Sequence, residues 1–101
     1  MMTLEQYLLV KIGEEASEIA QMAAKCSHFG LTETEPGRTE NNGQRMNREL
    51  NDLLAMVRTL QNIAGRDRYS FAPDESQIMA KIAKVDHYLT YSRSLGLVEP
   101  A

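Results

Sequence analysis

The chain has one cysteine, no tryptophan, three prolines and few aromatic residues, which make up 6% of its 101 residues. With Cys26 as the only thiol, an internal disulfide and a thiolate metal cluster are both excluded, and we expect a reducing, cytoplasmic location. No apolar run approaches the length of a membrane span, and no basic segment precedes an apolar one at the N-terminus. We therefore predict a soluble, unprocessed protein without a membrane partner.

An excess of basic residues is also missing, because 14 acidic residues outnumber 11 basic ones and give a net charge of −3. Proteins that bind nucleic acid use basic surfaces to neutralise phosphates, so nucleic acid is not expected as a partner. A chain this short forms one domain, 1–101, and buries a smaller share of its surface than a larger chain does. Association between copies is therefore expected to complete its core.

Helical periodicity dominates what is present. Thr3 and Gln6 form a capping box, and the apolar spacing that follows predicts a helix to His28 or Phe29, with Gly13 as a possible break. The polar, unperiodic segment 31–44 predicts a loop or substrate lid. A second helix is predicted to end at Ala64-Gly65, and a third to run from an Asp74 cap towards Gly96. No segment has the pattern of a strand. We predict an all-α fold, a bundle of three main helices completed by oligomerisation.

Acidic residues interrupt the apolar stripes of the first two helices in the same phase. On a helical wheel Glu15 lies among the apolar residues of its helix with Glu18 beside it, and Glu49 and Asp52 repeat the arrangement in the second helix. A buried, isolated carboxylate is very costly, so such acids should be paired, protonated or bound to metal. Convergence of the four on antiparallel helices predicts a site for Mg²⁺, or for Mn²⁺, and for a nucleotide's phosphates.

Each acid pair alone would usually mean a solvated helix surface. A di-iron bundle needs a Glu-x-x-His motif that the chain lacks. Two other hypotheses stay open. One is a non-catalytic helical adaptor that binds a basic partner protein through its acidic face. The other is a structural or sequestering magnesium site without turnover.

Two motifs resemble those of the MazG-like all-α nucleoside triphosphate pyrophosphohydrolases: Glu14-Glu15-Ala16-Ser17-Glu18 and Glu49-Leu50-Asn51-Asp52. Shorter likenesses to phage and bacterial members are Lys25, Phe29-Gly30 and the run from Lys84 to Ser92. The resemblance extends from about Leu9 to Leu97, although the gap between the two motifs is longer than usual.

This resemblance implies an all-α NTP pyrophosphatase-like fold, assembled as a homodimer or homotetramer. It implies hydrolysis of a (d)NTP between the α and β phosphates, for nucleotide-pool control or house-cleaning. The implied Mg²⁺ ligands and catalytic residues are Glu15, Glu18, Glu49 and Asp52, with a metal-bound water as nucleophile.

Six further residues are candidates for substrate binding: Lys25, Asn42, Lys81, Lys84, Tyr88 and Tyr91. Lys25 could contact a phosphate or only the helix dipole, and the lysines of the third helix could contact phosphates across a subunit boundary or only solvent. The tyrosines could stack on a base or simply pack. In and just after the loop, Arg38, Asn41, Asn42 and Arg45 could fold over a nucleotide, although most polar loop residues bind nothing.

Overall fold

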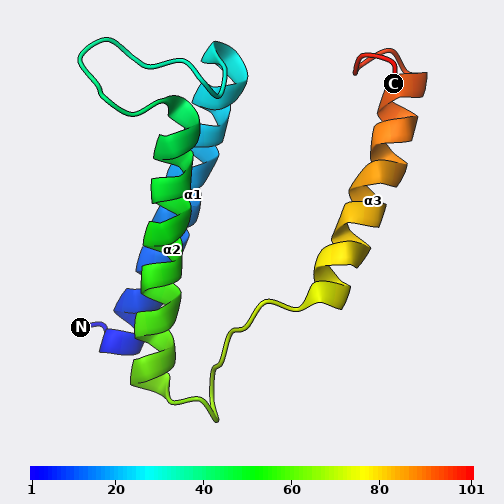
Figure 1. The fold of residues 1–101 in the computed structure, drawn as a ribbon. Helices are drawn as coiled ribbons and strands as arrows, with labels where there is room; N and C mark the ends of the chain where they lie inside the picture. The colour runs from blue at the N-terminus through cyan, green and yellow to red at the C-terminus, as the bar shows by residue number, and fades with distance from the viewer. The chain divides into compact units, whose positions relative to one another are not determined.

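The computed structural model describes all 101 residues, and its regular elements are three α-helices without a strand. They are α1 (Leu4–Phe29), α2 (Asn42–Ala64) and α3 (Glu75–Ser94) (Figure 1). The chain divides into two compact units, Met1–Phe71 with α1 and α2, and Ala72–Ala101 with α3. The all-helical class and the number of main helices predicted from the sequence are confirmed.

The first helix begins and ends where its local sequence predicts. The Oγ1 atom of Thr3 accepts a hydrogen bond from the Gln6 amide at 3.1 Å, and Gln6 Oε1 accepts one from the Thr3 amide at 2.9 Å. Gly13 causes no break, because α1 is continuous over 26 residues. Gly30 ends it with a φ of 97°, a conformation that costs residues with a Cβ atom.

The second helix begins earlier than predicted. Asn41 and Gln44 form a second capping box, so Asn42 is already helical and the loop is three residues shorter than the predicted segment 31–44. Residues 41–44 are polar like those of the loop, so the sequence pattern did not predict the cap. At the other end, Gly65 closes α2 as predicted, with a φ of 84°.

The helices α1 and α2 lie side by side and run in opposite directions, as a helical hairpin (Figure 1). Their shared core is small. Its buried apolar side chains are Leu8, Met22, Cys26 and Leu60. The half-buried apolar residues of the predicted stripes flank this core: Ile12, Ile19, Met46, Leu53, Met56 and Val57. Most of the two stripes therefore lies on the packed surface of the hairpin, and Cys26 is part of the core.

The loop between these helices is tied to both of them through Asn42. The Asn42 side chain is 2% exposed, and its amide nitrogen donates to the Gly30 carbonyl at 2.9 Å and to Glu33 Oε2 at 2.7 Å. Next to it, the Gly43 amide donates to the Leu31 carbonyl at 2.8 Å, and a Cβ at Gly43 would lie 3.2 Å from that oxygen. The loop therefore has a defined path over the end of the hairpin.

The third helix has the predicted cap but no buried residue. Asp74 Oδ1 accepts a hydrogen bond from the Gln77 amide at 3.1 Å. The apolar stripe of α3 is exposed at Ile78, Ile82 and Val85 and half-buried at Leu89. Amphipathic spacing therefore predicts the helix correctly, and the burial of its stripe is not seen within one chain.

None of α1, α2 and α3 contains the long apolar stretch that a membrane span requires.

Candidate metal centre

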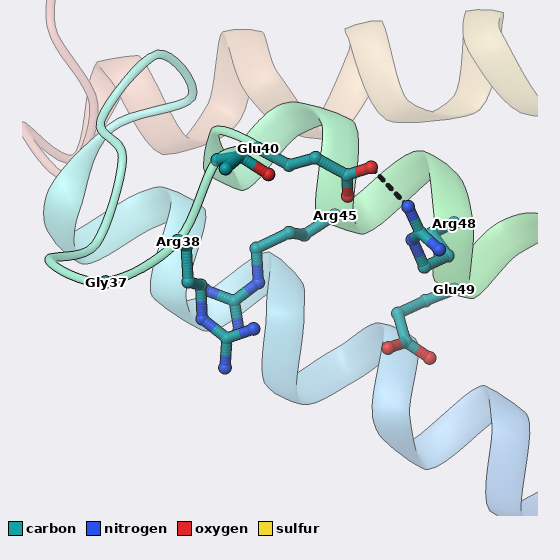
Figure 2. A pocket seen from close by; sticks show the side chains of 7 residues that line it. Gly37, Arg38, Glu40, Arg45, Arg48 and Glu49 are labelled. Atoms are coloured by element: carbon teal, nitrogen blue, oxygen red, sulfur yellow. Dashed lines mark hydrogen bonds and ion pairs between the residues drawn. The ribbon is translucent and has the colours of Figure 1, made fainter.

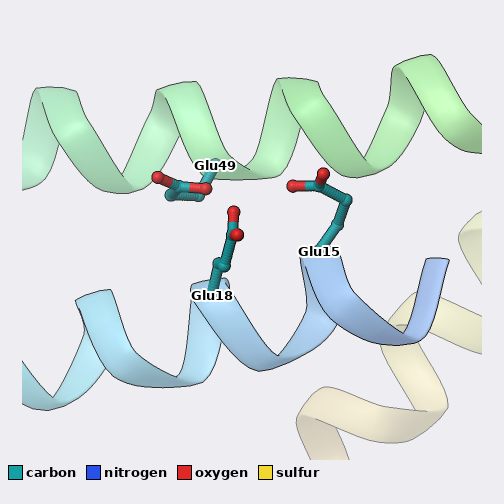
Figure 3. Close-up of side chains that lie close together, drawn as sticks. All are labelled: Glu15, Glu18 and Glu49. Carbon is teal, nitrogen blue, oxygen red and sulfur yellow. The ribbon is translucent and has the colours of Figure 1, made fainter. Parts of the chain in front are cut away.

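Three of the four predicted acids come together between α1 and α2. One carboxylate oxygen from each of Glu15, Glu18 and Glu49 lies within 4.8 Å of the other two (Figure 3). Figure 3 shows the two side chains from α1 and the one from α2 directed into the space between the helices. Because acids at a spacing of three residues lie on one side of a helix, Glu15 and Glu18 approach Glu49 together.

Glu15 in the first motif and Glu49 in the second are called the central acids here, and each has one carboxylate oxygen without a hydrogen-bond partner. Glu15 and Glu49 are half-buried, and the Oε2 atom of each is inaccessible to solvent and accepts no hydrogen bond. Buried polar atoms are nearly always paired, and an unpaired buried charge is costly. Both atoms therefore need a ligand or a proton.

The electrostatics of the cluster also disfavour negative charge. Desolvation raises the pKa of Glu15 above the usual 4.5, and the neighbouring carboxylates of Glu18, Asp52 and Glu49 raise it further. The pKa of Glu49 is likewise raised, first by desolvation and then by the neighbouring carboxylates of Glu18 and Asp52, while the Arg45 charge opposes the rise. A cation bound between these carboxylates would offset both the desolvation of their charges and the repulsion between them.

The donor set fits a hard divalent cation. All ligand atoms in the cluster are carboxylate oxygens, which suit Mg²⁺ and Mn²⁺ better than metals that prefer sulfur or imidazole. Mg²⁺ usually keeps several coordination positions for water and phosphate oxygens. Three carboxylates with two unpartnered oxygens therefore offer donor atoms of the type that Mg²⁺ and Mn²⁺ prefer.

Asp52, the fourth predicted ligand, is exposed and does not belong to the group of three. Its charge still raises the pKa of both Glu15 and Glu49. An aspartate side chain is one methylene shorter than a glutamate, so Asp52 reaches less far from α2 than Glu18 reaches from α1. Coordination by Asp52 stays a prediction.

Two of the predicted substrate-binding residues, Lys25 and Asn42, line a cavity together with Arg45. Lys25 is exposed, and the cavity, of about 240 Å³, is also lined by Phe29, Pro36 and other residues near the loop; Glu49 is not part of this lining. Asn42 is a buried helix residue whose amide nitrogen binds Gly30 and Glu33. The loop position predicted for Asn42 is therefore wrong, because the Asn41–Gln44 capping box includes it in α2.

The other four candidates belong to the second unit. Lys81, Lys84, Tyr88 and Tyr91 are all exposed on α3. Their contacts with a substrate stay predictions.

A basic cavity lies beside Glu49 and includes Arg38 and Arg45, which the sequence suggests as possible nucleotide contacts, whereas Arg48 and Glu40 were not predicted as site residues. Its volume is about 570 Å³, and its lining residues come from the loop and from α2 (Figure 2): Gly37, Arg38, Thr39, Glu40, Arg45, Arg48 and Glu49. Arg45 and Arg48 precede Glu49 by four residues and by one. Because residues four apart lie on the same side of a helix, the spacing of Arg45 places it on the Glu49 side of α2.

Comparison of the chain with family models, with curated proteins and with solved structures finds no match. The functional assignment therefore depends on the chain's own residues.

Proposed function

We propose that this chain is a Mg²⁺-dependent hydrolase that cleaves a (d)NTP between its α and β phosphates into a (d)NMP and pyrophosphate. The observation that supports this most directly is the pair of buried, unpartnered carboxylate oxygens of Glu15 and Glu49, in a cluster with Glu18. In a cell the activity would serve nucleotide-pool control or house-cleaning in the cytoplasm.

Glu15, Glu18 and Glu49 would hold the cation, and Asp52 would add negative charge at the edge of the site or complete the ligand set. A divalent cation supplies positive charge for phosphate oxygens and acidifies a water molecule. The carboxylates hold their positions because α1 and α2 pack against each other on both sides of them. A carboxylate of the cluster that is not fully used by the cation can orient the attacking water by accepting its proton.

The two other hypotheses make different demands on the acids. An adaptor needs accessible carboxylates to bind a basic partner, whereas the Oε2 atoms of Glu15 and Glu49 are inaccessible, which favours a metal site. A structural metal site without turnover fits the same cluster. The cavity that reaches Glu49 favours a site that also receives phosphate.

We further propose that the chain forms a homodimer or homotetramer. The hairpin buries only four apolar side chains, and α2 still exposes large ones such as Leu50, Leu54 and Ile63. On α3 the exposed apolar side chains include Ile78, Ile82 and Val85. Contiguous exposed apolar surface marks interaction sites. Sedimentation of the purified chain should give a mass of two or four copies, and a monomer at micromolar concentration would contradict this.

The test of the activity is pyrophosphate release from a panel of dNTPs and NTPs, with and without Mg²⁺. The wild type should release pyrophosphate only with Mg²⁺, and Glu49→Gln should not. Glu14→Gln is the matched control, because Glu14 is a neighbouring glutamate of α1 whose carboxylate pairs with Lys11 at 2.7 Å. No release from any nucleotide would reject the hydrolase. Calorimetry would then separate the alternatives: Mg²⁺ binding supports the structural site, and no binding supports the adaptor.

A further inference from the structure

The basic cavity adjoins the carboxylate cluster, because Glu49 belongs to both. Arg45 and Arg48 extend from the same helix as Glu49, and Arg38 lies in the loop (Figure 2). Positive side chains therefore stand directly beside the proposed position of the cation.

The three arginines suit a chain of phosphates. A guanidinium group offers several N–H donors in one plane and binds phosphate oxygens in pairs. The cavity of about 570 Å³ falls within the roughly 300–1,000 Å³ typical of small-ligand sites. A phosphate chain that begins at the cation can therefore continue into this cavity and meet positive charge there.

Two loop glutamates bind these guanidinium groups within the chain. Glu35 Oε2 accepts a hydrogen bond from Arg38 Nε at 2.7 Å and another from Arg45 Nη1 at 3.1 Å. Arg48 forms an ion pair with Glu40. The arginines are thus held at the cavity by carboxylates, which are anions like the phosphates they would meet.

We propose that the cavity binds the β- and γ-phosphates of the nucleotide, and that Glu35 and Glu40 give up Arg38, Arg45 and Arg48 to them. The identity of these phosphates rests on the proposed function. The pyrophosphate product would leave from the same cavity. The loop glutamates compete with the ligand, so arginine and glutamate variants should change affinity in opposite directions.

The first experiment is calorimetry of inorganic tripolyphosphate binding to the full chain with Mg²⁺. Arg48→Gln and Arg45→Gln should each weaken binding about tenfold, which corresponds to about 1.4 kcal/mol. Arg58→Gln is the control, because Arg58 is an exposed arginine of α2 that lines neither cavity. The Arg45 side chain is only 14% exposed, whereas that of Arg48 is 65% exposed, so the Arg48 variant tests the proposal without disturbing packing.

The second experiment removes a competitor. Glu40→Gln should tighten tripolyphosphate binding by a few fold, because Arg48 no longer has a carboxylate partner. A merely structural Arg48–Glu40 pair predicts no gain. A nucleoside triphosphate with a non-hydrolysable α–β linkage should show the same pattern, and a nucleoside monophosphate should not depend on Arg48. If tripolyphosphate follows the pattern and the nucleotide analogue does not, the nucleotide part of the proposal is overturned.

The outcomes separate this proposal from the hydrolase activity. If the wild type releases pyrophosphate but both arginine variants bind tripolyphosphate as it does, the cavity proposal is overturned and the hydrolase stands. The absence of tripolyphosphate binding to the wild type would also overturn the cavity proposal. If binding depends on the arginines but no nucleotide is hydrolysed, the cavity remains an anion site and the proposed function fails.

Discussion

The two acidic motifs of the hairpin share one spacing, yet they place their acids differently. In both, the central acid is half-buried: Glu15 in α1 and Glu49 in α2. Both flanking acids are exposed, but Glu18 has an oxygen in the cluster and Asp52 does not. Helical spacing sets the direction of a side chain, and we propose that the shorter aspartate side chain is what keeps the Asp52 oxygens out of the cluster.

The surroundings of the motifs also differ. Beside Glu49 lie Arg45 and Arg48, which line the basic cavity. Beside Glu15, Lys11 pairs with Glu14 at 2.7 Å. The site therefore has an acidic centre with a basic side towards the loop, and in the proposed function this difference would give a phosphate chain a preferred direction.

The largest expected effect tests whether Glu15 and Glu49 contribute equally to holding the cation. Glu15→Gln and Glu49→Gln should each lower the Mg²⁺-dependent rate on the order of a thousandfold, because each removes charge that holds the cation. Without metal, both variants should unfold at a higher temperature than the wild type, because a charge that desolvation disfavours is gone. Pyrophosphate release and thermal unfolding in EDTA measure the two effects. A variant that loses activity and stability together would instead indicate a damaged fold.

A smaller effect distinguishes Glu18 from Asp52, the acids that flank Glu15 and Glu49. Glu18→Gln should weaken Mg²⁺ binding about tenfold, and Asp52→Asn less than about threefold, because only Glu18 has an oxygen in the cluster. Mg²⁺ titration by calorimetry gives both values. Equal losses would show that Asp52 is a ligand in the metal-bound state, and the contrast between the motifs would disappear.

Lengthening the Asp52 side chain should reduce the difference between Glu18 and Asp52 in Mg²⁺ binding. Asp52→Glu adds one methylene, so its carboxylate should reach closer to the cation and tighten Mg²⁺ binding by about threefold, which is less than 1 kcal/mol. The control is Asp67→Glu, which lengthens an exposed acid beyond the end of α2. If Asp52→Glu weakens binding, side-chain reach does not explain the position of Asp52.

The smallest expected effect is a pH dependence of the metal-free protein. The folded-state pKa values of Glu15 and Glu49 lie above 4.5, so the stability linked to their protonation is present below 4.5 and is lost as pH rises through the folded values. The unfolding temperature in EDTA should therefore rise as pH falls from neutral towards 4.5. With both residues changed to Gln, this rise should vanish.

The opposite behaviour is expected of two groups outside the cluster. A hydrogen bond and ion pair with Arg38 lower the pKa of Glu35, and the amide of Gln77 lowers that of Asp74. Their contributions are present above their unfolded values and are lost as pH falls through the folded ones. The unfolding temperature should thus decline again in stronger acid, and a decline that begins at neutral pH would contradict the assignment for Glu15 and Glu49.

Much of the fold was predictable because its signals are local. The capping box of Thr3 and the terminal glycines Gly30 and Gly65 mark helix ends through neighbouring backbone groups. The capping box of Asn41 was missed because it lies in a polar segment. Asn42 was misplaced for the same reason, and its burial depends on Gly30 and Glu33, which are distant in sequence.

The sequence by itself determined the three helices and the phase of their acids, because periodicity and caps act within a few residues. It also identified Glu15 and Glu49 as acids within the apolar stripes, with Glu18 and Asp52 beside them. Only the tertiary structure decided which carboxylate oxygens meet, that two of them have no partner, and that arginines from the loop and α2 line a cavity beside them. These facts depend on the pairing of two helices and the path of the loop, where side-chain reach and through-space charge act between residues far apart in the chain.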